Sequence, residues 1–299
     1  MSAACRADHV PFVSHCVSMA QRADSEVTVQ EVIQGGLQRA TNHAAMKCLH
    51  YVLELGADVR QLSPHWLVSG EGTTETMRQV LEILVARGYD INSESSGTPV
   101  LWFVGVGDYD FLKWCLGQGA NVNPLKSTLP GSYRPRTTLL EQAAIVGNIE
   151  TFELLRSKGA PFDRKFGVFP TAVLAANDCP SKRHLRMLTH LLKVVGCDVN
   201  SRSYGPHYGS GSSCSTPLCW IACRPKGANV KELIWFLLDH GGDLDLSFEY
   251  TDSDNNFVVV QSARQTAQQS PSTREYNPLF WEAVEEWEER SRGSSSGEA

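Results

Sequence analysis

The chain has 299 residues, of which 42% are hydrophobic and 20% are charged, a balance that allows a buried core and argues against global disorder. Its 27 Lys and Arg side chains are outnumbered by 33 Asp and Glu side chains, which gives a net charge of −6. The sequence therefore has no general attraction to phosphate backbones or anionic membranes, and we expect neither nucleic acid nor a membrane as partner.

The first segment, residues 1–26, is expected to hold a helix over residues 9–23. Its apolar stretch is interrupted by Pro11, Ser14 and His15, so we expect no secretory leader, and no later run is long enough to span a membrane. Thr28 and Glu31 then have the spacing of a capping box. The next helix is expected to begin at this point.

One phrase recurs at the end of successive helical stretches: leucines, then a glycine, then an Asp or Asn. It reads LELGADV at residues 53–59 and LLDHGGDLD at residues 237–245. Leucines on the buried face followed by a glycine are typical of a helix that ends in a left-handed residue, and the Asp or Asn suits the turn that follows. The glycines of the six occurrences are Gly56, Gly88, Gly119, Gly159, Gly196 and Gly241.

Matching beginnings lie upstream of these helix ends, as GTPVLWFVGVG at residues 97–107 and STPLCWIAC at residues 215–223. With these motifs the sequence resembles the ankyrin-repeat family, whose repeat runs T-P-L-H, a first helix, a tight turn, a second helix and G-A-D-V-N. The resemblance implies an all-α solenoid of about six to seven helix-turn-helix repeats, with hairpin fingers and capping helices. The histidine of the family is absent, since Leu101, Glu141 and Cys219 stand in its place, so we do not expect its usual hydrogen-bond network.

The resemblance also sets the expected domain organisation: residues 1–26 form an N-terminal capping region, residues 27–290 one repeat domain, and residues 291–299 a disordered tail. Residues 262–268 suggest a seventh unit, and a closing helix with Pro278 at its first position follows. The six glycines are separated by 32, 31, 40, 37 and 45 residues, against about 33 for the plain repeat. The later repeats therefore carry insertions.

Two insertions, one before Thr138 and one before Thr216, combine aromatic and basic residues. In ankyrin geometry such segments lie on the fingers that border the concave groove, and Tyr and Arg anchor interfaces more often than most residues. The alternative is that both are tolerated long surface loops. The residues are Tyr133, Arg134 and Arg136 in one insertion, and Arg202, Tyr204, His207 and Tyr208 in the other.

The first helix of each repeat lines the groove in this family, and the exposed turn positions here are unusually apolar. Trp102 and Trp220 lie one turn earlier and could either extend this apolar surface or be wedged between repeats as core. The turn positions are Gly105, Val106, Ile145, Val146, Asn177, Asp178, Cys223 and Arg224.

Motifs for catalysis or for metal binding are not found. Cys214, Cys219 and Cys223 could be imagined as metal ligands, but two of them fall in a packed helix and no C-x-x-C partner exists, so we expect no metal. The sequence has no H-E-x-x-H motif, P-loop or nucleophile elbow, and we expect no cofactor. Nine cysteines without a disulfide pattern suggest a reducing compartment, the cytoplasm or the nucleus.

The leading hypothesis is a non-catalytic binding module or scaffold that recognises a protein partner through its groove and fingers. The alternative is a small apolar molecule held between the groove and the enlarged fingers, where His207, Tyr204 and Tyr208 are the groups that could support catalysis. The candidate binding residues are Trp102, Val106, Tyr133, Arg134, Arg136, Ile145, Val146, Tyr204, His207, Tyr208 and Arg224.

Overall fold

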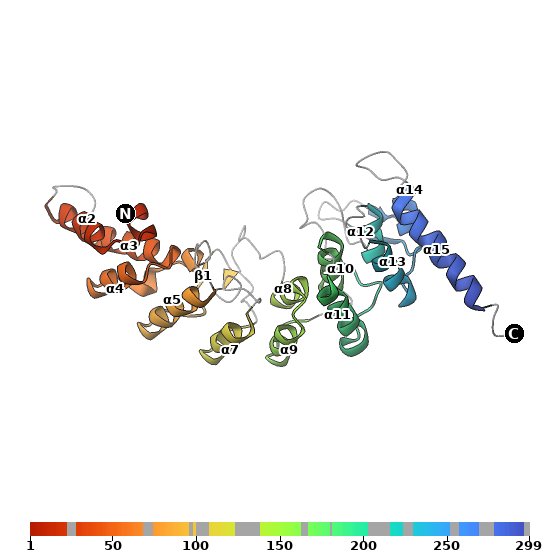
Figure 1. The fold of residues 1–299 in the computed structure, drawn as a ribbon, viewed down its shortest axis with the longest axis horizontal. Helices are drawn as coiled ribbons and strands as arrows, with labels where there is room; N and C mark the ends of the chain where they lie inside the picture. The colour runs from red at the N-terminus through yellow and green to blue at the C-terminus, as the bar shows by residue number, and fades with distance from the viewer. Residues whose placement is uncertain are drawn as a thin grey trace. The chain divides into compact units, whose positions relative to one another are not determined.

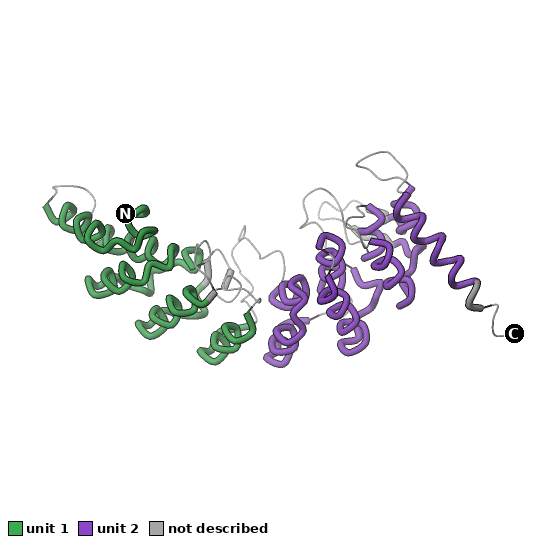
Figure 2. Tube along the Cα trace, in the orientation of Figure 1, with its two compact units in different colours: residues 1–135 green, residues 136–299 purple. Residues whose placement is uncertain are grey.

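A computed structural model gives the fold of the chain. It describes residues 1–22, 28–67, 74–95, 98–99, 108–122, 138–162, 167–179, 181–202, 216–223, 230–251, 257–268 and 278–295. Contacts divide the chain into two compact units, Met1–Pro135 and Arg136–Ala299, and each is described by itself (Figure 2). The single repeat domain over residues 27–290 stays a prediction.

The first unit consists of short helices, which Figure 1 shows from red to yellow. Two N-terminal helices pack on α3, which in turn packs on α4 and η2. A β-carbon at Gly36 would lie 2.9 Å from the Val52 side chain, so this glycine allows the close approach of α3 to α4. The helices are α1 (Ser2–Arg6), α2 (Val10–Arg22), α3 (Val29–Asn42), α4 (Met46–Glu54), the 3₁₀ turns η1 (Val59–Gln61) and η2 (Pro64–Leu67), α5 (Thr74–Ala86) and α7 (Tyr109–Gly117).

The second unit repeats one plan, in which a first helix packs on its second helix and on the first helices of neighbouring repeats. Thus α8, α10, α12 and α14 lie side by side in one layer, and α9, α11 and α13 each pack on a member of that layer. Helix α15 packs on α13. The helices are α8 (Leu139–Val146), α9 (Ile149–Ser157), α10 (Val168–Asp178), α11 (Lys182–His190), the π-helical turn η3 (Leu191–Val195), α12 (Pro217–Cys223), α13 (Val230–Asp239), α14 (Ala263–Gln268) and α15 (Pro278–Ser295).

Strands occur only as two short antiparallel hairpins within the described residues. Strands β1 (Glu94–Ser95) and β2 (Thr98–Pro99) form one, with Glu94 opposite Pro99. Strands β3 (Phe248–Thr251) and β4 (Phe257–Val260) form the other, with Phe248 opposite Val260. Each hairpin follows a helix-ending phrase, which is the place where ankyrin repeats have their fingers, so the expected all-α repeat fold with hairpin fingers is confirmed.

All six glycines of the recurring phrase have the left-handed conformation expected of them, with φ between 75° at Gly196 and 90° at Gly56 and Gly88. The Asp that follows also has a repeated role, because its carboxylate accepts a hydrogen bond from the backbone N–H two residues later. This Asx turn occurs at Asp58, Asp90, Asp198 and Asp243, with N···O distances of 2.8 to 3.0 Å. The phrase is therefore a helix end joined to a self-closing turn.

Side-chain amides tie these turns to one another along the array. Asn92 donates to the Gly119 carbonyl (3.0 Å) and accepts from the Asn121 N–H (2.7 Å). Asn200 repeats this geometry with Gly241 (3.1 Å) and Asp243 (2.8 Å). A turn-to-turn network thus exists without the family's histidine.

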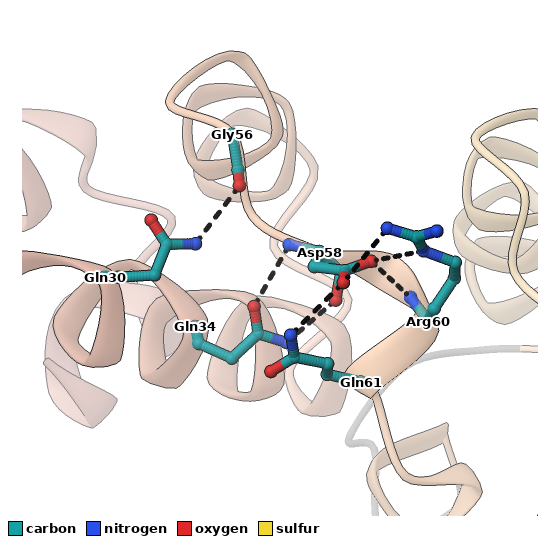
Figure 3. Close-up of polar contacts among 6 residues, drawn as sticks. All are labelled: Gln30, Gln34, Gly56, Asp58, Arg60 and Gln61. Atoms are coloured by element: carbon teal, nitrogen blue, oxygen red, sulfur yellow. Dashed lines mark hydrogen bonds and ion pairs between the residues drawn. The ribbon is translucent and has the colours of Figure 1, made fainter.

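At the first such turn, the amides come from helix α3 (Figure 3). Gln34 donates to the Asp58 carbonyl (2.9 Å) and accepts from the Asp58 N–H (3.1 Å), and Gln30 donates to the Gly56 carbonyl (3.2 Å). Both backbone groups of Asp58 are therefore satisfied by one side chain, which fixes the turn on the helix beside it.

Capping boxes occupy the places where the family has T-P-L-H. The Thr28 side chain accepts from the Glu31 N–H while the Glu31 carboxylate accepts from the Thr28 N–H at 2.7 Å, as the sequence predicts. Thr138 and Glu141 form the same box at the start of α8. In α14, Ser262 and Gln265 form a neutral version. These boxes satisfy N–H groups that a helix start leaves without partners.

The chain ends match the expected caps in position, with two differences. Helix α2 falls within the predicted span 9–23, but α1 precedes it, and Asp8 between them accepts hydrogen bonds from the N–H groups of Lys47 and Cys48 at the start of α4. Helix α15 begins at Pro278 as predicted and continues to Ser295, so residues 291–295 are helical although the tail is expected to start at 291. No helix in the described parts of the chain has the length and apolar character needed to cross a membrane.

Candidate functional site

The first helices of the second unit carry apolar side chains that the packing of the unit does not fully cover. Helices α9, α11 and α13 pack on α8, α10 and α12, and several apolar side chains of these first helices remain part-exposed. All six such apolar side chains are half-buried. We call their surface the inner face, and it consists of Ile145, Val146, Leu174, Ala175, Trp220 and Cys223.

The end of α8 is held by its neighbour in a defined geometry. His184, which is buried at the start of α11, donates from Nε2 to the Ile145 carbonyl (2.9 Å), because a carbonyl can only accept. Its Nδ1 is hydrogen-bonded to the Ser181 hydroxyl (2.9 Å). The backbone of Ile145 is thus fixed by a histidine that lies 39 residues away.

Gly147, which ends α8, makes this contact possible. Its φ is 73°, and a β-carbon there would lie 3.2 Å from both His184 and Arg183. Only a glycine combines the left-handed conformation with enough room for the histidine ring. The tight turn therefore sets where Ile145 and Val146 point.

The start of α8 carries a buried acid. Glu141 is 5% exposed, and burial raises the pKa of its carboxyl group, while the hydrogen bonds from Thr138 act in the opposite direction. Because this carboxylate already accepts from the Thr138 backbone (2.6 Å), its role is to cap the helix. It stands where ankyrin repeats have histidine, and it is buried there.

On the other side of the layer, a hydrogen bond connects two of the second helices. The Glu153 carboxylate is bonded to His190 of α11 (2.7 Å) and to Arg156 of its own helix (2.7 Å). Partial burial raises the pKa of Glu153, but these two partners outweigh it and the net shift is downward. The contact links α9 to α11 and lies away from the inner face.

At α10, the structure differs from the sequence-based prediction of which side chains are exposed. The sequence predicts Asn177 at an exposed turn position, but it is 3% exposed, and Leu174 and Ala175 are part-exposed in its place. Helix α10 starts after Gly167 without a side-chain cap. Asp178 is exposed as expected. Helix α10 therefore adds two part-exposed apolar residues that the sequence does not indicate.

Of the predicted binding residues, the structure places Ile145 and Val146 together on the inner face. Trp220, which the sequence leaves between surface and core, is half-buried on α12. The other nine predicted binding residues lie outside the described part of the chain. Three of these nine, Tyr204, His207 and Tyr208, are also the residues considered for catalysis. The nine residues are Trp102, Val106, Tyr133, Arg134, Arg136, Tyr204, His207, Tyr208 and Arg224.

Sequence reasoning missed Leu174 and Ala175 on the inner face, and also His184 behind it. The helical period of 3.6 residues does not identify the exposed positions in VFPTAVLAAND, because nearly all of these residues are apolar. Within the residues that the structure describes, no group of three His, Cys, Asp or Glu side chains could hold a metal ion.

Comparison with known proteins supports the fold. No family model matches the sequence, and no curated protein matches it either. Among solved structures, the crystal structure of the human ASB11 ankyrin repeat domain matches with a TM-score of 0.50 and 15% sequence identity. The match covers 83% of this chain and 96% of that chain. The chain thus has a divergent ankyrin-repeat fold, as the recurring phrase and the capping boxes indicate.

Proposed function

We propose that this chain is a non-catalytic protein-binding module that holds an apolar segment of a partner protein on its inner face. The observation that carries the proposal is the row of six half-buried apolar side chains on three adjacent helices. Contiguous apolar surface on a soluble protein is typical of an interaction site.

The support beneath this row suits recognition of a protein segment. Capping boxes, Gly147 and the His184 contact hold the ends of α8 in place, so binding costs little ordering of the surface itself. Trp220 is the natural anchor, since a part-exposed tryptophan can bury a large area in a partner's side chains. The other apolar residues would exclude water around it.

The finger residues belong to this proposal as flanking contacts. Tyr133, Arg134 and Arg136 precede α8, and the segment with Tyr204, His207 and Tyr208 precedes α12, so both sequences lead directly into helices that form the inner face. They would add polar contacts at the rim of an apolar centre, the usual arrangement of an interface. The small-molecule alternative depends on these same segments, and no described residue favours it.

Selection from a library of random peptides displayed on phage tests the proposal, because it requires no candidate partner protein. Leu174→Asp places a charge at the centre of the inner face and is expected to weaken selected peptides by about 2 kcal/mol or more. Leu55→Asp is the control, since Leu55 is a leucine that is 38% exposed and lies at the end of α4, in the other unit. Circular dichroism checks that both variants are folded.

Apolar peptides that lose affinity for the Leu174 variant and keep it for the Leu55 variant support the inner face as the binding site. Equal binding to both variants, or no apolar peptide after repeated rounds of selection, contradicts it.

A further inference from the structure

Helix α11 and the turn η3 present a strip of positive charge on the outer side of the second unit. Residues 179–197 contain no Asp or Glu, although the chain as a whole carries a net charge of −6. All four cations of this stretch are exposed, and they are Lys182, Arg183, Arg186 and Lys193. Lys182 and Arg186 lie four residues apart on one face of α11, and Lys193 follows in η3.

These cations differ from others in the same unit. Arg156, Arg264 and Arg290 each form an ion pair with a carboxylate at 2.7 to 2.9 Å. None of the four cations on α11 and η3 forms one with any residue that the structure describes. Four like charges on about three turns of helix repel one another, so a negative partner would stabilise them.

Helix α15 presents the opposite charge in the same kind of strip. Glu282, Glu285 and Glu289 are exposed and spaced by three and four residues, which places them on one face. They have no ion-pair partner within the described residues, whereas Glu286 pairs with Lys231 and Glu288 with Arg264. The glutamates that fasten α15 to its own chain are thus different from those that face outward.

An apolar side chain accompanies each strip. Among the described residues of the second unit, the exposed large hydrophobic side chains are Val194, 64% exposed, and Leu279, 52% exposed. Val194 follows Lys193 directly, and Leu279 lies three residues before Glu282. Each strip therefore combines one sign of charge with one exposed apolar residue, and the two strips are complementary.

We propose that the chain associates with a second copy of itself, through the basic strip of α11 and η3 in one copy and the acidic strip of α15 in the other. Each copy carries both strips, so association neutralises cations and carboxylates that no contact among the described residues neutralises. Exposed ion pairs are individually weak and are screened by salt, so the contact is reversible and sensitive to ionic strength. It leaves the inner face open for a partner and does not rest on the binding role proposed for that face.

Sedimentation equilibrium of the full chain at low and high salt tests this proposal with charge-reversed variants. Variant A is Lys182→Glu, Arg186→Glu and Lys193→Glu, and variant B is Glu282→Lys, Glu285→Lys and Glu289→Lys. Each alone should associate at least tenfold more weakly than the natural chain. An equimolar mixture of A and B should regain association to within about threefold, because the reversed strips are complementary to each other.

Matched controls separate this contact from a general effect of charge. Reversal of Arg22, Lys47 and Arg87 to Glu changes the net charge as much as variant A does, at exposed sites in the first unit, and should leave association unchanged. Leu174→Asp on the inner face should also leave it unchanged.

Restored association in the mixture supports the proposal, whether the products are closed dimers or longer chains. A natural chain that stays monomeric at low salt, or a mixture that associates no better than its two components, overturns it. In that case the two strips bind other partners or are only solvated.

Discussion

Asn92 and Asn200 show how one residue can connect repeats whose lengths differ. Each uses both ends of its amide on the backbone of the next turn, yet the partners lie 27 and 29 residues away in one case and 41 and 43 in the other. The inserted residues between Asn200 and Gly241 thus leave the turn-to-turn contact unchanged. Insertions are tolerated because they leave the helix end and its turn intact.

Glu31 and Glu141 are chemically equal members of two capping boxes, but their surroundings shift their pKa values in opposite directions. Hydrogen bonds from Thr28 lower the pKa of the exposed Glu31 carboxyl group, and burial raises that of Glu141. Gln265 in α14 shows that an amide can take the same position. Glutamine substitutions therefore isolate the effect of the charge.

Glu141→Gln should stabilise the protein at pH 7. A folded pKa above the ordinary 4.5 means that the native state binds more protons, so the natural chain loses stability as pH rises from about 4.5 through the raised value. Glu31→Gln should have the opposite effect, because a lowered pKa gives stability that is present above 4.5 and lost below it.

Urea unfolding of both variants between pH 3.5 and pH 7.5 measures these differences. Both variants should approach the natural chain toward the acidic end, as the two glutamate carboxyl groups take up protons. A Glu141 variant that is less stable than the natural chain at pH 7 would show that the carboxylate, and not merely an acceptor, is needed at this site.

Much of what concerns single residues could be predicted from the sequence, because it depends on neighbours in the chain. The left-handed glycines and the Thr28 box are examples. The contacts of His184 with Ile145 and of Asn200 with Gly241 could not, since both join residues from different repeats and the inserted lengths hide the register. Of the predicted binding residues, Ile145 and Val146 belong to the inner face, and the others lie outside the described part of the chain.

Helices were predictable where apolar residues recur with a clear period and less so where the whole segment is apolar. The closing helix is predictable from Pro278 onward because Phe280, Ala283 and Val284 share one buried face. The 3₁₀ turn η2 before α5 and the π turn η3 after α11 are not, since local spacing does not distinguish them from an ordinary helix end.

Helix α15 is fastened to α13 by a mixed set of contacts. Arg290 lies 4.7 Å from the centre of the Trp235 ring, whose Nε1 donates to the Ala283 carbonyl (2.8 Å). Arg290 and Trp287 also both bond Asp239. Below these contacts Phe280 is fully buried. The rim is polar and the centre apolar, as a terminal repeat in a solenoid requires.

Phe280→Ala should therefore destabilise the second unit by about 3–5 kcal/mol, because it leaves a cavity between α15 and the rest. Leu279→Ala, one residue earlier and half exposed, should change stability by no more than about 0.5 kcal/mol. Hydrogen exchange should show that backbone amides lose protection first in α13 and α15. Equal effects of the two substitutions would mean that α15 does not cover a core.

The molecule as a whole is expected to unfold as one repeat domain over residues 27–290, because repeats in such arrays stabilise only their neighbours and pass that stability on. Leu49 in α4 and Leu237 in α13 are fully buried, one in each compact unit. Replacing either with Ala should cost about 3–5 kcal/mol. Under the one-domain prediction, both variants should lower the midpoint of one calorimetric transition. The opposite result has a clear signature, in which the trace contains two transitions and Leu49→Ala shifts one while Leu237→Ala shifts the other. The two compact units would then be separate folding domains, and the boundary near residue 135 would replace the single span 27–290.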